Sequence, residues 1–344
     1  MGEQKRPPGW WSSAESHQAT ANPAREWRCS LTGIMSAAPL DSCANTANFR
    51  IRPAGERPVG AVRNIGIQPT DPLGWAFAFA ELGTLGPRLL VRNRRSVDPI
   101  VGTGAANVSL TSYGKRISTV WQTIETIGAG TVKPHRLILW LDDRDAYLDP
   151  PATLKRLQAR GLEIRHCRDY GPHKKYFPYL NEILPEEPDC TLVTADDDVY
   201  YPPSWLAELL AAHRPGEVTA FRARIRSDGP YRTWPMCTTT EASESVFATG
   251  VSGVAYPPEL LGALRDRGDV FAQVCPRADD YWLHYAAVST GIPIRQVRDV
   301  AAYFWPIVLV ASRGLWDGSG TANDAIAVRT RQTWQNFRNR PDAE

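Results

Sequence analysis

The residues best suited to chemistry are three consecutive acids, Asp196, Asp197 and Asp198. They follow the apolar run at residues 192–193, so we expect them at the end of a buried strand. On extended backbone the first and third side chains point the same way, and carboxylates that close repel each other unless a cation lies between them. Such oxygen ligands suit Mg²⁺ or Mn²⁺ and hence a diphosphate-bearing substrate. The structural alternative is an acidic turn that caps a helix beginning near Ser204.

A second acidic pair, Asp279 and Asp280, lies at the expected start of a helix. Acids at this position often cap a helix for structural reasons alone. The functional alternative is a general base whose partner acid holds it in place.

In the C-terminal half of the chain, any cation that meets a phosphate must be an arginine or belong to one pair of lysines. Lys174 and Lys175 follow His173, and no lysine occurs after Lys175. Paired lysines usually form a solvated face, whereas here they are also candidates for neutralising phosphate. Arg116, at the start of an expected helix, presents a fork of donors beside helix N-terminal amides, an arrangement that suits phosphate or ribose oxygens.

Strand and helix patterns alternate four times between residues 105 and 212. Apolar or β-prone runs predict strands, and amphipathic spacing predicts a helix after each of them. The expected strands are 107–110, 137–141, 162–165 and 191–194, and the expected helices are 117–127, 154–157, 176–184 and 205–210. This order is typical of an α/β fold with a mostly parallel sheet flanked by helices, which binds ligands beyond the carboxyl ends of its strands.

The two ends of the chain are less regular. Residues 1–104 keep no lasting period, and we expect a low-order N-terminal extension with at most one docked segment. Residues 75–80 could form a strand or a short helix. After residue 215 the pattern loosens, with a strand expected over 218–226 and a helix from Asp279.

Composition limits the functional class. The 344 residues are 43% apolar and 22% charged, as in ordinary soluble proteins, and a net charge of +2 gives no reason to expect nucleic acid as a partner. Six scattered cysteines without a CxxC pair disfavour a zinc site or a disulfide framework. The N-terminus has no secretory pattern, and the longest apolar stretch, 300–311, is too short to span a bilayer. We therefore expect a cytoplasmic protein without a transmembrane segment, with peripheral contact at the inner face of the cell membrane left open.

Ordered motifs across residues 105–300 resemble bacterial GT-A glycosyltransferases of the family-2-like type. The segments that carry the resemblance are 108–113 with 116–117, 123–125, 133–134 with 137–141, 161–165, 173–175, 194–202, 249–254, and 278–280 with Trp282. The resemblance implies a GT-A (nucleotide-diphospho-sugar transferase) domain over 105–300. Residues 301–344 would be a C-terminal segment that packs on this domain or trails it.

The resemblance also implies roles for individual residues. Asp196 and Asp198 would be the acids of a DxD motif, and Asp198 would bind the Mn²⁺ or Mg²⁺ that bridges a nucleotide diphosphate. Asp280, or alternatively Asp279, would deprotonate an acceptor hydroxyl, with inversion at the anomeric carbon. The residues expected to contact the nucleotide sugar are Thr111, Ser112, Tyr113, Arg116, Asp142, Lys174, Lys175, Asp196 and Asp197. His284, one helical turn after Asp280, is either a third metal ligand or a structural residue.

The implied enzyme is a hexosyltransferase that moves a sugar from a nucleotide-diphosphate donor to a saccharide or glycolipid acceptor, in polysaccharide or glycoconjugate synthesis. Two alternatives remain. One is a nucleotide-sugar-binding module that has lost catalysis. The other is a Mg²⁺-dependent phosphatase of the haloacid dehalogenase type, whose DxDx(T/V) motif fits residues 196–199 but whose later lysine is missing from residues 199–278.

Overall fold

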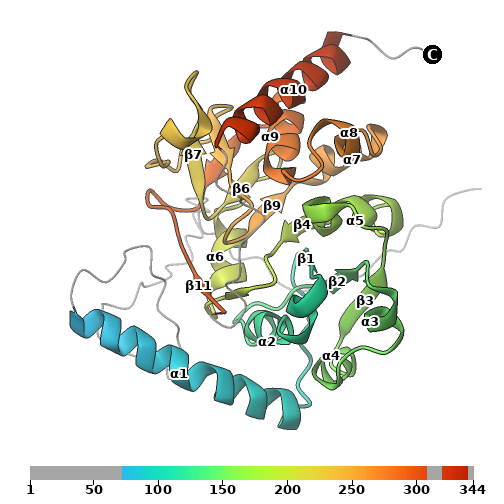
Figure 1. Ribbon diagram of the computed structural model, residues 1–344, viewed down its shortest axis with the longest axis vertical. Helices are drawn as coiled ribbons and strands as arrows, with labels where there is room; N and C mark the ends of the chain where they lie inside the picture. Colours follow the sequence, from blue (N-terminus) through green and yellow to red (C-terminus); the bar gives the residue numbers. More distant parts are fainter. Residues whose placement is uncertain (1–71, 308–319, 340–344) are drawn as a thin grey trace, which may run out of the picture. The chain divides into compact units, whose positions relative to one another are not determined.

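The computed structural model describes residues 72–307 and 320–339, with side chains described for 83–307 and 324–339. Seven strands form the main sheet (Figure 1). They are β1 (Ala106–Thr111), β2 (Leu137–Leu141), β3 (Leu162–His166), β4 (Thr191–Thr194), β6 (Val218–Ala220), β9 (Val254–Tyr256) and β10 (Ile294–Gln296). Two short antiparallel pairs join β5 (Val199–Tyr200) to β11 (Trp305–Pro306) and β7 (Ala223–Ile225) to β8 (Val246–Ala248).

The helices fall between these strands in the chain. The α-helices are α1 (Pro72–Arg95), α2 (Trp121–Gly128), α3 (Arg144–Leu148), α4 (Ala152–Gln158), α5 (Phe177–Glu182), α6 (Trp205–Ala212), α7 (Pro258–Asp266), α8 (Phe271–Val274), α9 (Asp279–Ser289) and α10 (Gly320–Asn339). Three short 3₁₀ helices are η1 (Gly114–Ser118), η2 (Gly171–Lys175) and η3 (Tyr231–Thr233). None of the helices in the described ranges is long and apolar enough to cross a membrane.

The sheet has the strand order β10-β6-β9-β4-β1-β2-β3. All neighbouring strands are parallel except at β9, which runs antiparallel to both β4 and β6. The expected α/β class, a mostly parallel sheet flanked by helices, is therefore confirmed. The four predicted strands before residue 200 all occur.

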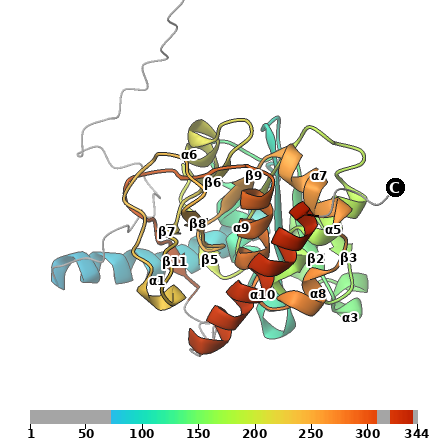
Figure 2. The ribbon, with the colours of Figure 1, turned by 90° about the horizontal axis from the view of Figure 1, so that it is seen from above.

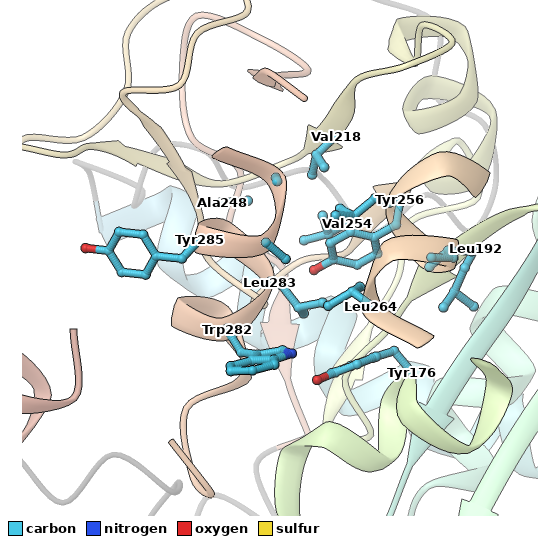
Figure 3. Close-up of a cluster of buried hydrophobic side chains, with 14 of the residues drawn as sticks. Tyr176, Leu192, Val218, Ala248, Val254, Tyr256, Leu264, Trp282, Leu283 and Tyr285 are labelled. Carbon is cyan, nitrogen blue, oxygen red and sulfur yellow. The ribbon is translucent and has the colours of Figure 1, made fainter. Parts of the chain in front are cut away.

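Alternation along the buried strands creates two separate cores. In β2, Ile138 and Trp140 belong to one cluster, and Leu137, Leu139 and Leu141 belong to the other, because successive side chains point to opposite faces. The first cluster is completed by α5, α7, α8, α9 and α10, and the second by α1, α2, α4 and α6. Figure 3 shows part of the first cluster, where side chains of β9, α7 and α9 pack together.

The reversed strand β9 matters for the site. Thr194, the last residue of β4, pairs with Val254, the first residue of β9. The segment 249–253 before β9 therefore lies at the same edge of the sheet as the acids that follow β4. A single edge thus collects the carboxyl ends of the parallel strands and the entry to the antiparallel one.

The structure adds detail at both ends of the domain. Residues 75–80, for which a strand or a short helix was expected, lie inside α1, a 24-residue helix. The predicted strand over 218–226 is divided into β6 and β7, which belong to different sheets. Within 301–344, α10 lies alongside α9 (Figure 1 and Figure 2), and the rings of Trp334 and Trp282 are 4.9 Å apart. The expectations for 1–71, 308–319 and 340–344 concern residues outside the described part.

Candidate active site

Asp197 turns inward and fixes the acidic loop after β4. Its carboxylate accepts hydrogen bonds from Ser112 Oγ (2.6 Å) and from Arg116 Nη1 (2.8 Å). Thr123 Oγ1 donates to the backbone carbonyls of Asp197 and Val199, at 3.0 and 2.9 Å. The hydroxyl of Ser112 is therefore used inside the protein, and Asp197 serves to hold the loop.

The flanking acids each contact a cation. Asp196 Oδ1 lies 2.5 Å from Lys175 Nζ, and Asp198 Oδ2 lies 3.1 Å from Arg116 Nη1. Burial raises the pKa of Asp198, and the carboxylate of Asp196 raises it further. The two acids are thus close enough to repel each other, as the spacing predicted.

Lys175 connects the acidic loop to the second acidic pair. Burial alone would lower its pKa, but the carboxylates of Asp196, Asp279 and Asp280 raise that pKa above the ordinary value for lysine. Its side chain is only 14% exposed, so these charges act with little solvent between them. The structure therefore brings the two acidic clusters of the sequence into one group around a single ammonium.

Asp280 has the most unusual carboxyl group in this set. Burial, and next the neighbouring carboxylate of Asp279, raise its pKa to about 7. Lys175 and a hydrogen bond from the backbone N–H of Gly250 oppose that shift. A carboxylate with a pKa near neutrality can take a proton from a hydroxyl and release it again at physiological pH.

His173 holds the two sides of this group together. Its Nδ1 lies 2.8 Å from the Tyr176 hydroxyl and its Nε2 lies 2.8 Å from the Cys275 carbonyl, so the loop carrying Lys175 is joined to the turn before α9. Burial lowers the pKa of His173 to about 4, and its ring stacks on Phe271 at 4.1 Å between centroids. A neutral, fully bonded histidine has a positioning role here.

Lys174 points to a neighbouring part of the same edge. Its ammonium, 3% exposed, pairs with Asp142 at 2.8 Å and with Asp169 at 3.1 Å. Tyr113 lies beside it, with its ring 6.0 Å from Lys174 Nζ and 5.4 Å from the Arg116 guanidinium, and is 39% exposed. This exposed ring flanked by cations is a platform on which a nucleotide base can stack. Thr111, by contrast, donates its hydroxyl to the Trp140 carbonyl at 2.9 Å.

The acids fit a divalent cation only in combination with a substrate. In the part of the chain that the structure describes, no group of three or more His, Cys, Asp and Glu side chains could hold a metal ion alone. Among the described residues, the acids 196–198 form ion pairs with Arg116 and Lys175, and the acids 279–280 form none. That negative excess, made of oxygen donors, suits Mg²⁺ or Mn²⁺ bound through one or two carboxylates together with phosphate oxygens.

His284 packs among aromatic side chains. It is buried against Phe247, with 4.8 Å between ring centroids, and neither ring nitrogen has a hydrogen-bond partner in the described structure. Burial and the nearby charge of Arg226 lower its pKa to about 3. Its surroundings favour the structural alternative over the ligand alternative.

Three residues of the site were not predicted. Asp169 follows β3 just as Asp142 follows β2, so the rule for carboxyl ends of parallel strands could have found it. Tyr256 is buried near the acids, and burial and the carboxylates of Asp279 and Asp280 raise its pKa. Gly250, which bonds to Asp280, lies in the segment 249–254 that carried the resemblance, but only the reversal of β9 brings it to this edge.

Comparisons with known proteins give distant likenesses only. No protein-family model matches the chain, and no curated protein matches it significantly. Among solved structures, S. aureus TarS (residues 1–349) is 13% identical, over 67% of this chain and 72% of that one, with a TM-score of 0.41. A mannosyltransferase from Pyrobaculum calidifontis, in complex with GDP-Man and Mn²⁺, is 11% identical over 78% and 87%, with a TM-score of 0.42.

A third structure, GalNAc-T7 with UDP, GalNAc and Mn²⁺, is 13% identical over 83% of this chain and 62% of that one, with a TM-score of 0.45. At such identities and TM-scores these likenesses do not indicate which substrate this chain binds.

Proposed function

We propose that this chain is a GT-A-type glycosyltransferase that moves a sugar from a nucleotide-diphosphate donor to a hydroxyl group. The observation that carries the proposal is the position of Lys175. Its ammonium contacts Asp196, and the carboxylates of Asp279 and Asp280 raise its pKa electrostatically. Binding a diphosphate needs positive charge, and activating a hydroxyl group needs a carboxylate base close to it. This group of residues supplies both at the edge where parallel sheets bind their ligands.

Donor binding uses the side of the site near β1 and β2. The Tyr113 ring would stack on the base, while Arg116 and Lys174 offer positive charge beside it. Asp198 and Asp196 would hold Mn²⁺ or Mg²⁺, which when bound supplies charge that stabilises the departing diphosphate. Lys175 adds a fixed ammonium next to the same acids.

Acceptor activation falls to Asp280. Its raised pKa lets it accept the hydroxyl proton, and Asp279 and the Gly250 N–H hold the carboxylate in place. The activated oxygen attacks the anomeric carbon on the face opposite the leaving diphosphate, so the configuration inverts. A saccharide or glycolipid is the acceptor class we propose, at a cytoplasmic location.

Titration calorimetry with UDP and GDP, with and without Mn²⁺, tests the donor site. Asp198→Ala should abolish Mn²⁺-dependent nucleotide binding, whereas Asp189→Ala, at an exposed position before β4, should not change it.

Asp280→Asn should leave nucleotide binding nearly intact and remove hydrolysis of the matching donor in a screen of UDP-, GDP- and dTDP-sugars. Loss of both functions in Asp280→Asn would contradict the assigned roles. Nucleotide binding without hydrolysis in the wild type would favour the binding module, and turnover of p-nitrophenyl phosphate without nucleotide binding would favour the phosphatase.

A further inference from the structure

Three arginines alternate along β7 without a carboxylate partner. Arg222, Arg224 and Arg226 occupy every second position of an extended segment, since the pairing with β8 continues through the backbone of Arg222 and Arg226 at its two ends. None of the ion pairs between described residues includes any of the three. We call these residues the β7 arginine row.

The guanidinium groups of the row are buried enough that a missing hydrogen-bond acceptor costs free energy. The Nε atom of each arginine is buried and has no hydrogen-bond partner in the described structure. Arg222 donates to Thr249 Oγ1 at 2.9 Å, and Arg224 donates to the Trp234 carbonyl. Buried donors on charged groups without an acceptor are costly, and a bound anion would remove that cost.

A pocket opens at the far end of the row. It has a volume of about 300 Å³, and its walls include Arg226, Arg331, Trp234, Tyr285 and Asp324. Figure 3 shows the Tyr285 hydroxyl pointing away from the other labelled side chains. The charges of Arg226 and Arg331 both act on that hydroxyl and oppose the rise in its pKa that burial causes. Two guanidinium groups and a phenol thus converge on one cavity.

Acids are also present at the pocket. Asp228 and Asp324 line it, and Asp324 Oδ1 accepts a hydrogen bond from the backbone N–H of Tyr231 at 2.9 Å. The pocket itself holds two arginines, Arg226 and Arg331, against these two acids. The excess of positive charge lies along the row, at Arg222 and Arg224, whose buried Nε atoms have no hydrogen-bond partner in the described structure. A ligand that spans the row and the pocket would therefore have to be anionic to meet that excess.

The near end of the row reaches the candidate base. Arg222 bonds to Thr249, which precedes the Gly250 that bonds to Asp280. Tyr231, whose ring lies 5.2 Å from the Arg224 guanidinium, is close enough to Asp280 for that carboxylate to raise its pKa, after burial itself. The row therefore runs from the site of hydroxyl activation to the pocket.

We propose that the acceptor is an anionic saccharide or polyol, whose phosphate or carboxylate groups bind the β7 arginine row and the Arg226–Arg331 pocket. The inference rests on the proposed function, because it assigns the acceptor of that same site. Phosphate and carboxylate share the ability to accept two hydrogen bonds from one guanidinium. The row would hold the chain of the acceptor while one of its hydroxyls meets Asp280.

The test is calorimetric titration of the full chain at low salt with glycerol 3-phosphate and, separately, with glucuronate. We expect the wild type to bind at least one of them, and the stronger ligand identifies the anionic group. Arg226→Gln should weaken that binding by about tenfold, the loss expected for one charged hydrogen-bonding pair. Arg226→Lys, which keeps the charge, should weaken it less. The matched control, Arg232→Gln, changes an exposed arginine of η3 that does not line the pocket, and should stay within about twofold of the wild type.

Thermal unfolding of each variant shows whether Arg226→Gln still folds. If it does not, Arg226→Lys and Arg331→Gln decide the question. The proposal is overturned if the wild type binds neither anion, or if replacements of Arg226 and Arg232 have equal effects. Nucleotide binding is titrated separately on the wild type, so a failure of the proposed donor site is recognised independently of the anion result.

Discussion

Lys175 is the side chain on which the candidate site depends at the scale of single residues. Its neighbour Lys174 looks equivalent in the sequence, yet the two ammonium groups serve different places. Lys174 pairs with Asp142 and Asp169, while Lys175 pairs with Asp196. The two lysines meet different acids because they are consecutive residues of the 3₁₀ helix η2, in which neighbouring side chains point in different directions.

The pH dependence of activity should follow Asp280. Because its pKa is raised to about 7, the base form is scarce at pH 5 and predominates above pH 7. We expect kcat/KM for donor hydrolysis to rise about tenfold per pH unit below this value and to level off above it. His173 does not contribute, because its pKa is lowered to about 4. An inflection near pH 4 instead would contradict the role of Asp280.

The raised pKa of Asp280 also makes the stability of the folded state depend on pH. The unfolded chain loses the Asp280 proton near the ordinary aspartate pKa, whereas the folded chain keeps it up to about pH 7. The folded state therefore binds more protons between these values, and the contribution of this group to stability falls as pH rises through that window. Melting curves should show Asp280→Asn gaining stability relative to the wild type at pH 8 and not at pH 4.

Elements were predictable where burial alone decides their type. The run at β2 is apolar on both faces, and β1 and β4 are short β-prone runs, so local sequence was sufficient to predict them. Helix α1 could not be predicted this way, because Pro87 lies inside it and its C-terminal part is held by contacts with a distant residue, Glu125. The acids of the site were found from their spacing, but the role of the segment before β9 required the direction of that strand.

The close approach of Gly250 to Asp280 provides a test at the scale of the element. A Cβ atom at residue 250 would lie 3.1 Å from Asp280 Oδ1, so Gly250→Ala should push the carboxylate aside without unfolding the protein. We expect a loss of about tenfold or more in kcat with nucleotide binding retained, because small misplacements of a base are costly. Gly262→Ala, on α7 where nothing lies within 4 Å of such a Cβ, is the control and should leave kcat unchanged. Equal activity of both variants would argue against Asp280 as the base.

At the scale of the whole domain, Glu125 joins segments distant in the chain. Its carboxylate is completely buried and is bonded to Arg160 at 2.5 Å, to Asn93 at 3.0 Å and to Arg92 at 3.1 Å. Helices α1 and α2 and Arg160, the second residue after α4, thus share one ionic centre. Its function is architectural, since it lies among the helices of one face and outside the acidic group of the site.

Glu125→Ala should lower the free energy of unfolding by about 3–5 kcal/mol, because it leaves Arg160 buried without a counter-charge. Urea denaturation measures this change. Glu186→Ala is the control, since Glu186 is 69% exposed and lies 4.0 Å from Arg136, and its replacement should change stability by less than about 1 kcal/mol. A change below about 1 kcal/mol for Glu125→Ala as well would show that the ionic centre adds nothing to the fold.

The direction of the strands also separates the edge of the sheet where the parallel strands begin from the edge that holds the candidate site. The turn at Pro188 and Asp189 is exposed and leads into the start of β4, at the opposite edge of the sheet from the acids that follow the same strand. A fluorophore or a short affinity epitope inserted between these two residues would be separated from the acids of the candidate site by the length of β4. That edge is where the protein can be tethered or labelled for single-molecule work while the edge with the candidate site stays free.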